Sequence, residues 1–517
     1  MKRSLKLYSK ISQQGSNKLH VTLSLMVILS FSVRITAQPY YVASDGNDDL
    51  NGSEATPFKT IEKAISVVQE GETIYVRGDT FNLETTISIS KSGLSSAMIS
   101  LFAYPGERPV LDFSGQAMGS SNRGIRLSGD YWHIKGIDIT GAGDNGMKIE
   151  GGSNNIIENC AFYRNRDSGM QLDNGASNNT IINCDSYYNA DPTDYGDADG
   201  FAPKLTVGSG NYFYGCRAWK NCDDGWDGYL RGADDVSNSA ENCWSFENGY
   251  LENGTDPGSQ ANGNGFKMGG SDDKTLKHNF TLKNCLAFKN KVKGFDQNNN
   301  KGSMILYNCT GHQNLTANYR IMQTLAAGKV LIVKNCVDLG GSAEIANFAE
   351  QEKNSWMDPF VVTSEDFLSV AEAAAYGPRK EDGSLPDIDY MHLAAGSDLI
   401  NAGVDVGLPY KGLLPDLGCF ETDITSLHNF QLSEGVICYP NPSDGKGYLE
   451  FSLAAAGHCE IRLYDISGRF IRILTELPLK AGKQHIAIDV ADIEDGMYVG
   501  RVTVDNIPFV NIRLIKQ

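Results

Sequence analysis

The chain has 517 residues and a formal net charge of −18, with 55 glycines and 16 prolines. A chain this acidic is a poor nucleic-acid binder, and its composition suits many short strands joined by tight turns rather than a helical protein. If such a protein binds an acidic polymer, it needs a local cationic group or a metal ion between the two.

The N-terminal residues 1–37 have the features of an export signal. Basic residues between Lys2 and Lys18 precede an apolar run at 21–33, which has the length of a signal core and is short for a membrane span. Ala37 offers a cleavage position before Gln38. The alternative is an uncleaved anchor. We expect a signal peptide at 1–37 and no transmembrane segment in the mature protein.

The next segment combines strand and helix patterns. Residues 40–43 and 73–77 look like strands, and 60–69 have helical periodicity, with Ile61, Ala64, Ile65 and Val68 on one face. A short helix there would cover the open end of a stack of strands, whose exposed edge would otherwise aggregate.

The middle of the chain repeats the pattern cysteine, four residues, asparagine. Six copies and a degenerate seventh begin at Cys160, Cys184, Cys216, Cys243, Cys285, Cys309 and Cys336. A base unit of about two dozen residues is typical of a solenoid. The repeat predicts an all-β fold, a right-handed parallel β-helix with coils over about 73–345 inside a domain of residues 38–425.

The same repeat accounts for seven of the eleven cysteines. Stacked cysteines fill the coil interior as small apolar groups, and stacked asparagines hydrogen-bond along the axis, so no disulfides are required. The sequence contains no C-x-x-C pair, which argues against a zinc site.

Residues 436–517 have a different character. Alternating strands surround the elements YPNP at 439–442 and YDISGR at 464–469, and predict a small β-sandwich. These elements resemble the C-terminal sorting domain of the type IX secretion system of Bacteroidetes. The resemblance implies the secretion machinery as a partner and a secreted or surface-attached protein, and it leaves open whether the domain is removed. A carbohydrate-binding or spacer sandwich is the alternative.

Two neighbouring repeats hold the densest acidic segments, 196–205 and 221–229. Aligning their Gly-Phe and Gly-Trp pairs sets Asp199 beside Asp224 on adjacent coils, about 4.8 Å apart along the axis. Asp223, Asp224 and Asp227 then share one turn and the strand after it. Carboxylates this close repel each other unless a cation joins them, and oxygen ligands around a glycine turn favour calcium, with the Gly225 carbonyl as a further ligand. The alternative is that these are ordinary turn residues.

Lys267 lies in the next coil, in the segment NGNGFKMGG at 262–270. It follows a Gly-Phe pair as Asp227 follows a Gly-Trp pair, so both occupy the same strand position one coil apart. A lone strand lysine is usually a solvated surface residue. Beside the aspartates, we expect it to point into the same groove and to take part in the site.

The segments DADGFAPKLTVGSGNYFYGC, CDDGWDGY and NGFKMGG resemble those of the family-nine polysaccharide lyases. These are right-handed parallel β-helix enzymes that cleave pectate or rhamnogalacturonan, and the resemblance covers roughly residues 38–425. It implies that Asp199, Asp223, Asp224 and Asp227 bind calcium and that Lys267 is the catalytic base. Pro203 stands where a small residue is expected, a departure that does not touch the ligands.

The chemistry of the residues agrees with this resemblance. Calcium on a uronate carboxylate stabilises the charge that develops when the neighbouring carbon loses its proton, and a neutral lysine amine can take that proton. Candidates for sugar binding are Lys204, Arg231, Lys293, Asn298 and Arg320.

We therefore predict a secreted, monomeric, calcium-dependent lyase that cleaves an acidic plant cell-wall polysaccharide, pectate, by β-elimination. A rhamnogalacturonan lyase is the nearest alternative, and endo or exo action is open. Two others are a β-helix glycoside hydrolase with Asp223 and Asp224 as its acid and base, and a non-catalytic β-helix adhesin.

Overall fold

The computed structural model describes residues 38–422, 437–453, 455–465, 470–504 and 507–517. The predicted signal peptide at 1–37 lies outside these residues, as does part of the YDISGR element. No helix within the described residues is long and apolar enough to cross a membrane.

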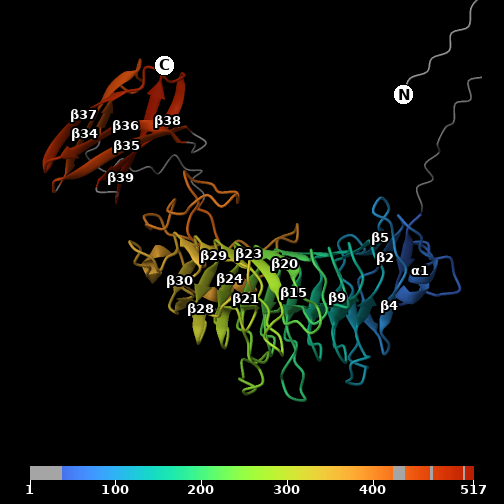
Figure 1. Ribbon diagram of the computed structural model, residues 1–517. Helices are drawn as coiled ribbons and strands as arrows, with labels where there is room; N and C mark the ends of the chain where they lie inside the picture. Colours follow the sequence, from blue (N-terminus) through green and yellow to red (C-terminus); the bar gives the residue numbers. More distant parts are fainter. Residues whose placement is uncertain (1–37, 423–436, 454, 466–469, 505–506) are drawn as a thin grey trace, which may run out of the picture. The chain divides into compact units, whose positions relative to one another are not determined.

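Residues from Tyr40 onward form a parallel β-helix whose coils contribute strands to three parallel sheets (Figure 1). The long sheet has twelve strands: β1 (Tyr40–Val42), β2 (Thr73–Val76), β5 (Ile99–Ala103), β8 (Trp132–Lys135), β11 (Ile156–Glu158), β14 (Thr180–Ile182), β17 (Tyr212–Tyr214), β20 (Val236–Glu241), β23 (His278–Lys283), β26 (Met304–Tyr307), β29 (Leu331–Lys334) and β32 (Glu350–Glu352).

The other two sheets have ten strands each. We call the first the groove sheet: β4 (Ile87–Ile89), β7 (Ile125–Leu127), β10 (Met147–Glu150), β13 (Met170–Asp173), β16 (Phe201–Pro203), β19 (Trp226–Asp227), β22 (Phe266–Lys267), β25 (Lys293–Asp296), β28 (Ala317–Ile321) and β31 (Ala343–Ile345). We call the second the covered sheet: β3 (Thr80–Asn82), β6 (Val110–Asp112), β9 (Asp138–Thr140), β12 (Ala161–Tyr163), β15 (Asp185–Tyr187), β18 (Arg217–Trp219), β21 (Trp244–Phe246), β24 (Leu286–Phe288), β27 (Thr310–His312) and β30 (Val337–Leu339).

The repeat residues stack inside the coils as the sequence predicts. The seven repeat cysteines are all buried and free. Asparagine side chains join successive coils: Asn165 Nδ2 donates to Asn189 Oδ1 at 2.9 Å, and the ladder continues at 2.8 to 3.0 Å as far as Asn314. These bonds satisfy amides that would otherwise be buried without partners, and so keep the coils in register.

A second asparagine ladder runs through Asn155, Asn179, Asn211 and Asn238, with Nδ2 to Oδ1 distances of 2.9 to 3.0 Å. The sequence analysis did not identify this ladder, although each of its members stands five residues before a repeat cysteine.

The first coil begins earlier than the sequence suggested. β1 pairs in parallel with β2, so the long sheet starts at Tyr40 rather than near residue 73. The predicted helix is α1 (Ile61–Val67), which lies at the N-terminal end of the stack (Figure 1). The side chain of Thr60 caps its first turn, and Ile61, Ala64 and Ile65 are buried.

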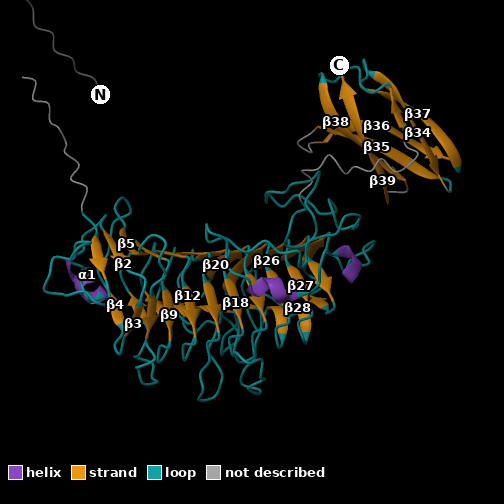
Figure 2. Cartoon of the chain, turned by 180° about the vertical axis from the view of Figure 1, so that it is seen from behind, coloured by secondary structure: helices purple, strands orange, loops and turns teal. Residues whose placement is uncertain are grey.

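Residues 353–422 follow the last coil and pack on the covered sheet. They include two 3₁₀ helices, η1 (Ser364–Asp366) and η2 (Glu372–Tyr376); Figure 2 shows a short helix lying across the strands. Tyr376 meets the ring of Phe246 edge-on at 5.0 Å, and Tyr390 meets Phe288 at 4.8 Å. This segment therefore shields the aromatic face of the covered sheet.

The C-terminal residues form two antiparallel sheets, as predicted for a small sandwich. One contains β33 (Ile437–Tyr439), β34 (Lys446–Leu453) and β37 (Gly482–Asp489); the other contains β36 (Phe470–Leu479), β35 (Gly457–Asp465), β38 (Gly496–Val504) and β39 (Ile507–Lys516). Leu449, Phe451, Ile461, Leu463 and Val502 are buried in its core.

Candidate active site

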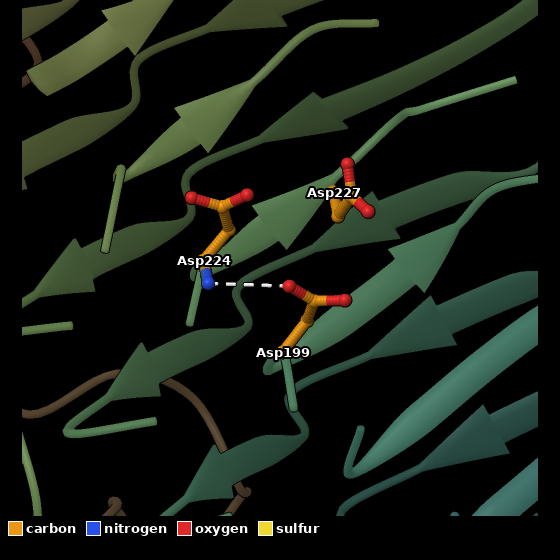
Figure 3. Close-up of side chains that lie close together, drawn as sticks. All are labelled: Asp199, Asp224 and Asp227. Carbon is orange, nitrogen blue, oxygen red and sulfur yellow. Dashed lines mark hydrogen bonds between the residues drawn. The ribbon is translucent and has the colours of Figure 1, made fainter. Parts of the chain in front are cut away.

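Three aspartates converge on the groove sheet. Asp199, Asp224 and Asp227 are buried, and each offers a carboxylate oxygen within 4.8 Å of the other two (Figure 3). Asp199 and Asp224 lie one coil apart, because Phe201 on β16 pairs with Trp226 on β19. The backbone N–H of Asp224 donates to Asp199 Oδ1 at 3.1 Å.

The glycine before each aromatic residue permits this stacking. A Cβ at Gly200 would lie 2.6 Å from the Gly225 carbonyl oxygen, and a Cβ at Gly225 would lie 1.9 Å from Ser245 Oγ. Inside the coil, the rings of Phe201, Trp226 and Phe266 stack at centroid distances of 4.8 and 4.7 Å. The Gly-aromatic motif thus anchors each strand and directs the residue after it outward into the groove.

Lys267 lies beside the three aspartates. Its Cα pairs with that of Asp227 across β22 and β19, as the sequence alignment predicts. Its Nζ lies 2.9 Å from Asp224 Oδ2 and 3.2 Å from Asp227 Oδ1. The ammonium group also lies 5.5 Å from the centre of the Tyr229 ring.

Lys204, which the sequence suggested for sugar binding, is a second ammonium group within the cluster. Its Nζ lies 2.7 Å from Asp199 Oδ2 and 3.6 Å from Asp227 Oδ2, and its side chain is 7% exposed. This position holds the Asp199 carboxylate by a charge-assisted hydrogen bond.

The other two predicted metal ligands have different surroundings. Asp223 is not one of the three converging carboxylates: its oxygens accept backbone N–H groups of Asp197 at 3.2 Å and Asn262 at 3.0 Å. The Gly225 carbonyl accepts the Phe201 N–H at 2.9 Å within the sheet. Asp223 therefore ties together two loops beside the site.

Of the remaining sugar-binding candidates, one lines the pocket that contains Lys267 and three do not. Arg231 lines the same pocket as Lys267 and pairs with Asp272 at 2.9 Å. Lys293, Asn298 and Arg320 lie on coils beyond Lys267 and do not line this pocket, which the described residues form. Lys293 pairs with Asp296 at 3.1 Å, Asn298 Nδ2 donates to the Gly269 carbonyl at 3.3 Å, and Arg320 pairs with Glu344.

Sequence reasoning missed several groove residues. The pocket has a volume of about 300 Å³ and extends from Lys267 to Arg123, Asn145, Lys148 and Gln171. These four carry no motif of their own. Lys148 and Gln171 share the outward strand position of Lys267, so extending the register alignment upstream would have indicated them.

Asn264 was also missed. It directly precedes Gly265, just as Asp199 and Asp224 each precede a glycine on the two previous coils. Its Nδ2 donates to Asp224 Oδ1 at 2.7 Å. Its own Oδ1 is buried and has no hydrogen-bond partner among the described residues. This amide oxygen is a further oxygen donor beside the carboxylates.

Burial and mutual repulsion dominate the electrostatics of the cluster. Burial, together with the neighbouring carboxylates, raises the pKa of Asp199 and of Asp224, and raises that of Asp223 to about 7. Burial also acts to raise the pKa of Asp227, but the ammonium groups of Lys267 and Lys204 outweigh it and hold that pKa below its usual value.

The pKa of Lys267 responds in the opposite sense. Burial lowers it, but the charges of Asp224 and Asp227 outweigh burial, so the pKa stands above its usual value. When ionised, the three converging carboxylates outnumber the two ammonium groups, which leaves an excess of negative charge. All the atoms in the cluster that could ligate a metal ion are oxygens, so the residues present fit a hard divalent cation such as calcium.

We predict that calcium affinity rises with pH. Burial raises the pKa values of Asp199 and Asp224, and raises that of Asp223 to about 7, so protons compete with calcium over a higher pH range than at ordinary carboxyl groups. Calorimetric calcium titrations between about pH 6 and about pH 8 should therefore show the dissociation constant falling as pH rises. An affinity indifferent to pH would mean that these carboxyl groups do not form the site.

Comparison with known proteins agrees with this geometry. Residues 40–336 match the family model described as Pel9A-like, right handed beta helix region, and residues 437–517 match the secretion system C-terminal sorting domain. Pectate lyase L of Dickeya dadantii is 38% identical over 75% of this chain and 91% of its own length. Pectate lyase L of Paenibacillus polymyxa is 39% identical over 73% and 86%.

Two solved structures extend the comparison. That of pectate lyase Pel9A has a TM-score of 0.69 and 38% identity, and covers 74% of this chain and 96% of its own. That of a rhamnogalacturonan lyase has a TM-score of 0.61 and 29% identity, and covers 69% and 97%.

The fold, the carboxylate and lysine cluster, and these similarities define the class of protein: a polysaccharide lyase, carried to the cell surface or beyond by its sorting domain. More particularly, the chain belongs to the Pel9A-like right-handed β-helix family and is an enzyme of the pectate lyase type. The monomeric state and the signal peptide stay predictions.

Proposed function

We propose that the enzyme cleaves pectate, a homogalacturonan, by calcium-dependent β-elimination, with Lys267 as the base. One observation carries the proposal: Lys267 Nζ lies 2.9 Å and 3.2 Å from two carboxylates of a buried cluster that fits a divalent cation. Asp199, Asp224 and Asp227 would hold calcium, with Asp223 close by. Bound calcium would neutralise a substrate carboxylate and stabilise the charge that develops on it.

The two lysines of the site have different roles in the proposed mechanism. Lys267, as the neutral amine, takes the proton from the carbon next to the uronate carboxylate. The electron pair forms a carbon-carbon double bond, and the glycosidic bond one carbon further breaks, with its electrons leaving on oxygen. Lys204 keeps Asp199 in position through its ion pair. The uncharged fraction of Lys267 increases with pH. The carboxylates raise its pKa and so shift this increase to higher pH, which favours turnover under alkaline conditions.

Two alternatives compete with this proposal. A hydrolase would need two carboxyl groups about 5 to 9.5 Å apart across the scissile bond, whereas the carboxylates here converge on one point with an ammonium group on either side. Rhamnogalacturonan is the alternative substrate that a specific observation favours, namely the structural similarity to a rhamnogalacturonan lyase.

The nature of the product tests the proposal. Elimination leaves an unsaturated uronate, so we expect the ultraviolet absorbance of a polygalacturonate digest to rise with time. Addition of a calcium chelator should stop the rise, and excess calcium should restore it. A parallel digest of rhamnogalacturonan identifies the preferred polymer. Cleavage without an increase in absorbance would indicate hydrolysis instead.

A further inference from the structure

The pocket at Lys267 continues along the groove sheet toward the N-terminal coils. Lys148 on β10, Gln171 on β13, Asp227 on β19 and Lys267 on β22 occupy the same outward position on successive strands, with Ala202 on β16 between them. Four strand spacings separate Lys148 from Lys267, about 19 Å at 4.8 Å each. Ala202 itself is fully buried, and on these coils the pocket is lined by Lys204 and Asp227.

The far end of the pocket contains buried donors that make no hydrogen bond. Asn145 is 1% exposed, and its Nδ2 has no hydrogen-bond partner among the described residues. The Nε of Arg123 is also buried and makes no hydrogen bond there, although it lies 3.5 Å from Asp144 Oδ2 in an ion pair. Both residues line the pocket. Buried donors of this kind are rare in folded proteins and are costly unless a ligand or water accepts from them.

The charges at the far end of the pocket indicate which chemical groups of a ligand can bind there. Lys148 already faces Asp173 at 3.4 Å and Glu150 at 3.7 Å, and Arg123 faces Asp144 at 3.5 Å. These ion pairs leave no surplus positive charge to hold a carboxylate. The hydroxyl groups of a sugar ring both donate and accept, so they can accept from Asn145 and Arg123 while donating to the carboxylates.

We propose that Arg123, Asn145, Lys148 and Gln171 form a distal subsite that binds the hydroxyl groups of a sugar residue in the substrate chain. The inference rests on the proposed function, since it assigns this subsite to the same polymer. It also gives the substrate a direction: the chain extends from Lys267 toward the N-terminal coils, not over β25 and β28. The ring is either a galacturonate of homogalacturonan or a rhamnose of rhamnogalacturonan.

Affinity measured as a function of ligand length tests the subsite without depending on turnover. In a Lys267→Arg background with saturating calcium, calorimetry would give dissociation constants for a trimer, too short to span about 19 Å, and for an octamer. The octamer should bind more tightly than the trimer. Asn145→Ala and Lys148→Met, each added to that background, should weaken octamer binding about 10-fold and leave trimer binding unchanged.

Arg320→Ala provides the matched control. Arg320 is a cation in the same outward position on β28, on the opposite side of Lys267. The Arg320→Ala substitution should not alter the binding of the trimer or of the octamer. Repeating the titrations with galacturonan and rhamnogalacturonan oligomers identifies which ring occupies the subsite.

Three results would overturn the proposal: equal loss for trimer and octamer, no loss with either kind of oligomer, or a length-dependent loss in Arg320→Ala. Failure of the proposed function would show separately, as wild-type enzyme that yields no ultraviolet-absorbing product. Circular dichroism and thermal melting of the variants confirm that the fold is retained.

Discussion

The Lys267→Arg variant loses turnover by about 10²- to 10⁴-fold, the usual contribution of a general base. Arginine retains the positive charge and can still pair with Asp224 and Asp227, which lie 2.9 and 3.2 Å from the lysine Nζ. It cannot release its proton in a protein, so it cannot accept one from the substrate. The loss should therefore fall on kcat, as measured by the absorbance of the unsaturated product at saturating calcium.

Lys293→Arg is the matched control for this experiment. Lys293 lies on β25, one coil beyond Lys267, and pairs with Asp296 at 3.1 Å outside the pocket. The same substitution there should leave kcat and calcium affinity unchanged. If Lys267→Arg retained near wild-type turnover, another group would be the base.

The Asp199→Asn variant tests the metal cluster and should have the second large effect. The carboxyl group of Asp199 is fully buried, and burial raises its pKa. Asparagine has nearly the same size and removes the charge that burial disfavours, so the fold should tolerate it. Calcium binding needs the charged carboxylate, because affinity depends on ligand charge.

We expect the calcium dissociation constant of Asp199→Asn to rise by about 100-fold or more, with turnover recovering in part at high calcium concentration. Asp272→Asn is the control, since Asp272 is 66% exposed and pairs with Arg231 at the surface. Isothermal calorimetry gives the affinities, and thermal melting checks the fold. Unchanged affinity in Asp199→Asn would place the cation elsewhere.

The stacking of repeats made most of this architecture predictable from sequence. Each cysteine and asparagine returns to the same place in every coil, so aligning the Gly-aromatic pairs was enough to put Asp199 beside Asp224 and Lys267 beside Asp227. The start of the first coil was missed, because residues 43–72 separate β1 from β2 and hide the repeat.

Side-chain direction was harder to predict than strand register. Lys204 follows Pro203 on β16 and appeared in the sequence as a candidate for sugar binding, but its ammonium group pairs with Asp199. Asp223 is adjacent to Asp224 in the turn, yet its oxygens accept N–H groups from loops whose lengths follow no repeat. Arg123 and Asn145 carry no motif, and only the three-dimensional groove brings them into line with Lys267.

We propose above all that an amine and a calcium site share one pocket on the groove sheet. A crystal structure determined with calcium and an oligogalacturonide bound to Lys267→Arg tests it most directly. We expect calcium on oxygens of Asp199, Asp224 and Asp227, with a uronate carboxylate on the ion and residue 267 beside the carbon that loses its proton. Calcium bound away from these carboxylates, or an oligomer lying outside the groove, would contradict it.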